Sequence, residues 1–183
     1  RQRLQAMLGH EFAELVNGLG AKRGKTTAFM VFANTVAARS HKNPANGRGW
    51  MGVRFQERPG EEPSEIILHV HLLDKTALGQ QEALGIVGVN LVHGARFSPG
   101  EPTALIASLM DELSRERIDV DMIKFSGPAF TGVDNRLMSL QLVERGLTDA
   151  AMFTAAGEVV QPSEVLYKKP VLAERGSFRP ATK

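Results

Sequence analysis

Two histidines, His69 and His71, stand at alternate positions of an apolar segment. In a β-strand, residues two apart point to the same face with their backbones about 6.5–7 Å apart, so both imidazoles could contact one metal ion. Asp74 and His93 are conceivable further ligands. A tetrahedral site needs at least three protein ligands, but the chain has no cysteine and no HExxH-type spacing. The pattern favours histidines that are packed and hydrogen-bonded within the fold, and we predict neither a metal nor a cofactor.

A long polar loop between Phe125 and Arg136 is the preferred ligand site. It follows a predicted strand and precedes a predicted helix, and in α/β folds ligands lie at the carboxyl ends of parallel strands, near helix N-termini. The alternative is an ordinary connection in which Asp134 caps the helix. The predicted ligand-binding residues, which include two cations of the C-terminal tail, are Ser126, Gly127, Thr131, Gly132, Asn135, Arg136, Lys169 and Arg175.

Two other basic segments have the composition of nucleotide sites. The glycine- and lysine-rich segment at 18–26 lacks the spacing of a P-loop, which needs a glycine where Leu19 stands. A helix also precedes this segment, whereas a P-loop follows a strand, so we interpret it as a helix end. In the C-terminal tail, Tyr167 and Phe178 lie among lysines and arginines and could stack on a base. The alternative there is solvated surface.

Periodicity predicts the elements that position these residues. The strand at 66–73 has apolar residues on both faces and should be buried. The segment at 77–95 is apolar nearly all round, which predicts a buried helix. Each of its four glycines costs about 1 kcal/mol relative to alanine, which indicates close contact with a sheet or another helix. Further helices are predicted at 4–19, 102–115 and 134–145, and further strands at 26–36, 50–56, 118–125 and 147–153, with one or two more in 158–179.

Together these elements predict an α/β or α+β fold with a mixed sheet and helices packed on it. The first three strands are joined by loops, which indicates an antiparallel three-strand part. The strand, helix and strand at 118–125, 134–145 and 147–153 indicate a parallel βαβ unit. The glycine-rich helix should be central and buried. We expect residues 1–183 to form a single α/β domain, and because the first residue is Arg1, an internal fragment of a longer chain.

Composition excludes several classes of function. The formal net charge of +2 is too small to indicate nucleic-acid binding. The longest apolar run, near 83–92, is too short for a bilayer, so no membrane partner is expected. The absence of cysteine leaves no disulfide framework and fits a reducing, cytoplasmic location.

Four segments of the chain resemble the middle region of a longer protein family from cyanobacteria and other bacteria, a family without an established activity. The segments are GWMGVRFQ (49–56), LLDKTALGQQEALGIVGVNLVHGA (72–95), VDNRLMSLQLVERGLTDAAMF (133–153) and QPSEVLYKKPVLAERGSFRP (161–180). Some members carry the name nicotinate-nucleotide adenylyltransferase. The motifs do not support that activity, because such enzymes need a His-x-x-His-type turn after the first strand, and His10 lies alone in a predicted helix. The resemblance implies flanking regions and no catalytic residues.

Two classes of function follow. In the first, the chain is a domain of a larger bacterial protein that binds a small anionic ligand, such as a phosphorylated metabolite or a nucleotide. In the second, it is a non-catalytic structural or assembly module whose sheet edge or glycine-rich helix forms a homo-oligomer or an interface with the remaining domains of its own chain. No nucleophile–base pair or carboxylate dyad singles out a reaction, so we predict no enzyme class.

Overall fold

The computed structural model describes residues 1–23, 25–40 and 46–172. Four strands form an antiparallel sheet in the order β1-β2-β3-β4, and two short strands, β5 and β6, form a second sheet. The strands are β1 (Met30–Asn34), β2 (Gly47–Phe55), β3 (Ser64–Leu72), β4 (Ile118–Ser126), β5 (Met152–Phe153) and β6 (Val159–Val160). The helices are α1 (Gln2–Arg23), α2 (Ala77–Phe97), α3 (Pro102–Ser108), α4 (Asn135–Glu144) and α5 (Pro162–Leu166), with a 3-10 turn, η1, at Pro128–Phe130.

The described chain therefore combines helices with a four-stranded antiparallel sheet, an α+β arrangement. The predicted antiparallel three-strand part is confirmed, because β1 pairs with β2 and β2 with β3 in antiparallel register. The predicted parallel βαβ unit is wrong. β4 runs antiparallel to β3, and β5 pairs with β6 instead of joining the large sheet. A helical connection is long enough to return the chain in either direction, so the order strand–helix–strand did not determine how the strands pair.

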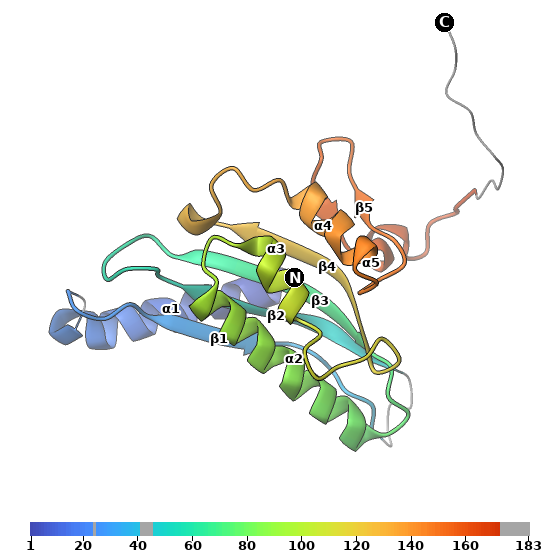
Figure 1. Ribbon diagram of the computed structural model, residues 1–183, viewed down its shortest axis with the longest axis horizontal. Coiled ribbons are helices and arrows are strands. Elements are labelled where there is room, and N and C mark those ends of the chain that lie inside the picture. Colours follow the sequence, from blue (N-terminus) through green and yellow to red (C-terminus); the bar gives the residue numbers. More distant parts are fainter. Residues whose placement is uncertain (24, 41–45, 173–183) are drawn as a thin grey trace, which may run out of the picture.

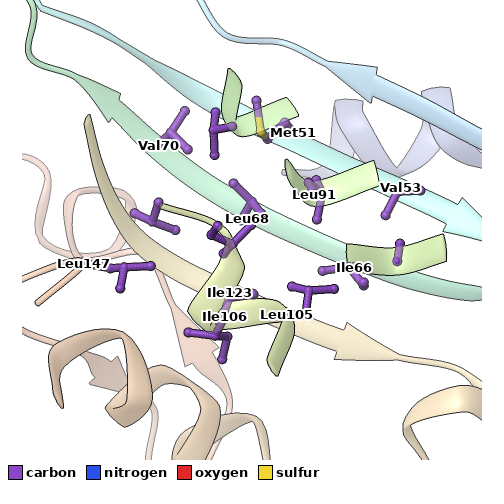
Figure 2. Packing of buried hydrophobic residues seen from close by; sticks show 14 of the residues in the cluster. Met51, Val53, Ile66, Leu68, Val70, Leu91, Leu105, Ile106, Ile123 and Leu147 are labelled. Atoms are coloured by element: carbon purple, nitrogen blue, oxygen red, sulfur yellow. The ribbon is translucent and has the colours of Figure 1, made fainter. Parts of the chain in front are cut away.

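Helices cover both faces of the sheet. In Figure 1, α2 and α3 lie in front of the sheet and α1 lies behind it, while α4, α5 and β5 gather beside β4. The larger hydrophobic cluster lies between the sheet and α2, α3 and α4. Figure 2 shows part of it, with Leu91 of α2 and Leu105 of α3 near Leu68 and Ile66 of β3. The sheet face toward α2 is thus filled by core side chains.

The opposite face of the sheet carries a smaller hydrophobic cluster. Leu4 and Leu8 of α1 pack there against Trp50 of β2, Ile67 of β3 and Met122 of β4. Because side chains alternate between the faces of a strand, the histidines of β3 lie on this second face, which has the smaller hydrophobic cluster.

The prediction that α2 is a central, buried helix is wrong. Its buried residues recur at steps of three and four, as in a helix that covers one face of a sheet. On the other side, Leu78 is 76% exposed, Val89 67% and Phe97 68%. An apolar composition therefore did not imply burial all round. Close packing explains one of its glycines, because a Cβ atom on Gly94 would lie 2.9 Å from the Leu105 side chain of α3.

The ends of the helices follow local chemistry in part. The Thr76 hydroxyl accepts a hydrogen bond from the Gly79 amide at the start of α2, and the Asp134 carboxylate caps α4 by accepting one from the Arg136 amide. By contrast, α1 continues to Arg23, four residues beyond the predicted end at position 19. Within the described ranges, every helix is either too short or too polar to span a bilayer.

Candidate functional site

The two histidines of β3 lie on the sheet face that α1 covers only in part. Buried His69 contacts Trp50 of β2, with the ring centroids 4.8 Å apart. His71 is the neighbour on the same face, with its ring centroid 5.1 Å from that of His69. The predicted common direction of the two imidazoles is therefore correct.

A β-bulge in β4 adds a carboxylate to this pair. His69 is opposite Met122 and Val70 is opposite Val120, so Asp121 is an extra residue in the register between the two strands. Such a bulge interrupts the alternation of side chains and redirects one of them. Here it places the Asp121 carboxylate between the two imidazoles.

The three side chains form a compact polar cluster. Asp121 Oδ1 lies 2.7 Å from His69 Nδ1, and Asp121 Oδ2 lies 3.2 Å from His71 Nε2. The second contact has the length of an ion pair but not the direction of a hydrogen bond, so the buried Nε2 atom of His71 has no hydrogen-bond partner in the described chain. Gln161 Nε2 donates a hydrogen bond of 2.9 Å to Asp121 Oδ2. The ligand atoms of the two histidines and the aspartate all lie within 4.8 Å of one another.

The electrostatics of the cluster follow from these contacts. Burial by itself would raise the pKa of Asp121, but its contacts with His69 and His71 and the Gln161 hydrogen bond hold that pKa well below its usual range. In return, the contact with Asp121 raises the pKa of His71. Asp119, directly opposite His71 in the sheet, has a raised pKa because burial and the nearby Asp121 charge disfavour its ionised form. The cluster thus holds an ionised Asp121 carboxylate against two imidazoles on a partly buried face of the sheet.

A polar pocket of about 450 Å³ opens beside the cluster. α5 forms one wall, and its first residues are tied down by Gln161, whose side-chain oxygen accepts hydrogen bonds from the Glu164 amide and the Ser163 hydroxyl. Glu164 in turn accepts a hydrogen bond from the Trp50 indole. The lining residues are Arg48, Gly49, His69, Gln161, Ser163, Glu164 and Tyr167. We call this hollow the polar pocket.

The polar groups of the predicted 126–136 loop are largely engaged within the protein. The Arg136 guanidinium forms a fork with Asp134, with its shortest contact at 2.7 Å. Asn135 accepts from the Phe125 amide and donates to the Phe125 carbonyl, and the Thr131 hydroxyl donates to Pro128 O. Gly127 packs so closely that an added Cβ atom would lie 2.6 Å from Ser64 Cα. Ser126 and Gly132 are exposed to solvent, and a Cβ atom added to Gly132 would meet no other atom.

The remaining predicted site residues lie elsewhere. Lys169 follows α5, where its amide donates to Leu166 O, whereas Arg175 and Phe178 lie outside the described residues. Asp74 is paired with Arg117, and His93 is an exposed residue of α2 in contact with Phe97. Neither belongs to the group of close donor atoms around the β3 histidines.

Sequence reasoning missed Asp121 and Gln161. A signal for the first existed, because Asp119 and Asp121 alternate along β4 as His69 and His71 do along β3. Two polar pairs with the same period fit together once the strands are neighbours. Gln161 carries no such signal, since only the packing of the 161–167 segment against β4 brings it near.

Comparison of the chain with family models, with curated proteins and with solved structures finds no match. The resemblance to a longer bacterial family stays a prediction. The geometry of the site is therefore the basis for a proposal about function.

Proposed function

We propose that this protein binds a small anionic ligand, such as a phosphorylated metabolite or a nucleotide, in the polar pocket. The observation that carries the proposal is the Arg48 side chain at its rim. None of the described residues forms a hydrogen bond or an ion pair with that guanidinium, whereas Arg54, Arg117 and Arg136 are each paired with a carboxylate. A free arginine beside a concave site suits a phosphate or carboxylate, to which it donates two parallel hydrogen bonds.

The other charges around the polar pocket are compatible with an anion. Glu164 is partly engaged within the protein, because its carboxylate accepts a hydrogen bond from the Trp50 indole. The raised pKa of His71 favours its cationic form. On the outer side, Lys168 Nζ lies 5.2 Å from the centroid of the Tyr167 ring, and this ring is 70% exposed. An exposed aromatic ring beside a lysine, in a pocket that Arg48 also lines, supports a ligand that combines a planar group with a negative charge.

The test uses AMP and inorganic phosphate as probes, with EDTA in the buffer, and titration calorimetry as the measurement. We expect Arg48→Ala to weaken the binding of both probes by roughly 10–100-fold, the worth of a charge-assisted hydrogen bond. Tyr167→Ala should weaken AMP by a similar factor through lost stacking and leave phosphate unchanged. Arg136→Ala is the matched control and should have no effect. Loss of binding in Arg136→Ala but not in Arg48→Ala would move the site to the 126–136 loop.

Assembly is a second candidate function, and the open edge of β1 favours it. Gln56 N donates to Phe29 O and Thr35 N to Trp50 O, so the odd-numbered residues of this strand face β2. Because residues of an antiparallel pair alternate in direction, the backbone groups of Met30, Phe32 and Asn34 point away from the sheet. The strand has no charge, proline or bulge to block a further strand.

An apolar groove of about 650 Å³ runs along this open edge, between β1 and α2, and its lining includes Phe32, Val89 and Phe97. Antiparallel pairing of two β1 strands about a twofold axis at Phe32 would satisfy the outward backbone groups of both copies and cover these side chains. We expect a homodimer in sedimentation equilibrium. Phe32→Glu should make it monomeric, because two like charges then face each other. The control is Leu78→Glu, which changes an exposed residue of α2 outside the groove. This variant should remain a dimer. A wild-type monomer would contradict assembly through this edge.

A further inference from the structure

We infer that His69, His71 and Asp121 bind a divalent transition-metal ion beside the polar pocket. The sequence argued against a metal because the third ligand was missing, and the conceivable candidates, Asp74 and His93, do not lie near the histidine pair. The β-bulge supplies that ligand from the neighbouring strand. Three protein ligands with the fourth position open is the arrangement of zinc sites that also bind a small molecule.

The ligand types select the class of ion. Two imidazoles and one carboxylate suit zinc and its neighbours among the transition metals, whereas calcium and magnesium prefer oxygen ligands throughout. The group lies on two paired strands, and its members are largely withdrawn from solvent, with side-chain exposures of 6% for His69, 29% for His71 and 11% for Asp121. A rigid and partly dry site lowers the cost of holding three ligands in place.

The distances are close to those that a metal requires. Ligand nitrogens lie about 2.0–2.1 Å from zinc, which puts two ligand atoms of a tetrahedron roughly 3.3 Å apart. Asp121 Oδ2 and His71 Nε2, at 3.2 Å, already have this separation, whereas Asp121 Oδ1 and His69 Nδ1, at 2.7 Å, would move apart by about 0.6 Å. The three ligand atoms lie within 4.8 Å of one another, so the adjustments that a metal requires are small.

Two further observations point to a ligand here. Nε2 of His71 is buried without a hydrogen-bond partner in the described chain, and so is Asp119 Oδ1 on the strand opposite. Buried polar atoms are rarely left unpaired in folded proteins. Gln161 also holds the Asp121 carboxylate by a hydrogen bond, as outer partners commonly hold metal-ligating carboxylates. The group adjoins the polar pocket, because His69 and the Asp121 partner Gln161 both line it.

The experiment is a titration of the EDTA-treated and desalted full chain with Zn²⁺, and with Co²⁺ as a spectroscopic probe. We expect one ion per chain, displaced by EDTA, and visible absorption bands of four-coordinate cobalt. His71→Gln and His69→Gln should each weaken Zn²⁺ binding at least a hundredfold. Removing a residue that only holds a metal ligand by a hydrogen bond typically weakens binding 10–100-fold. His93→Gln, which changes an exposed histidine of α2, is the control and should bind as the wild type does.

A stoichiometric ion that survives in the variant with both His69→Gln and His71→Gln would overturn the proposal, and so would a wild-type chain that takes up no Zn²⁺ at millimolar concentration. The circular dichroism spectrum of each variant shows whether it is folded. His71→Gln, at the most exposed of the three ligands, keeps the test decisive if the other variants unfold. Metal binding and the anion proposal fail separately, because the AMP and phosphate titrations contain EDTA and depend on Arg48.

Discussion

Asp121→Ala is expected to lower the free energy of unfolding by about 3–5 kcal/mol when it is measured in EDTA, the cost of removing one partner from a buried ionic group. The substitution removes the acceptor of the 2.7 Å contact from His69 and of the 2.9 Å hydrogen bond from Gln161. Both donors are almost fully buried, so water does not replace the lost carboxylate. For a chain of this length, the melting temperature should fall by roughly 6–20 °C.

The matched control is Asp149→Ala, which removes an aspartate that is paired with Arg115 but 91% exposed. An exposed ion pair contributes little, so we expect a change within about 0.5 kcal/mol. Urea unfolding followed by circular dichroism measures both variants. If Asp121→Ala unfolds within about 1 kcal/mol of the wild type, the carboxylate is not the centre of a buried network. Gln161 also caps α5, so we expect proteolysis near α5 to quicken in Asp121→Ala alone.

Leu91→Ala is expected to cost about 2–5 kcal/mol, the range for buried leucines whose loss leaves a cavity. Leu91 is fully buried in the larger hydrophobic cluster, between α2 and the sheet. Val89 is only two residues away on the same helix, but a rotation of about 200° puts it on the opposite side, where it is 67% exposed. Val89→Ala should therefore change the free energy of unfolding by no more than about 0.5 kcal/mol.

The comparison of these two variants tests whether α2 has one buried side. Urea unfolding at low protein concentration is the measurement, so that self-association through the apolar groove does not contribute. Equal losses at both positions would mean that α2 is enclosed on both sides, as its composition alone suggested. A loss at neither position would mean that the helix does not pack on the sheet.

The sequence by itself determined the local elements where a period was clear. Alternation along 66–73 indicated β3, and three- and four-residue steps indicated α1 and α4. The Thr76 and Asp134 caps follow from side chains that can accept a hydrogen bond from a free helix amide. Composition was a poorer guide for α2, because an apolar face can stay exposed when no element covers it. The direction of β4 was also beyond local signals, since the hydrophobic pattern of a strand is the same for parallel and antiparallel neighbours.

The candidate site divides in the same way. The sequence showed that His69 and His71 share a face, because that follows from the geometry of a single strand. The tertiary structure alone decided that β4 lies beside them, that a bulge turns Asp121 between the two rings, and that Gln161 and Arg48 border the same pocket. These residues are separated by tens of positions along the chain. Their meeting depends on strand pairing and packing, which are set by the burial of the whole core and cannot be read from the few residues on either side of each side chain.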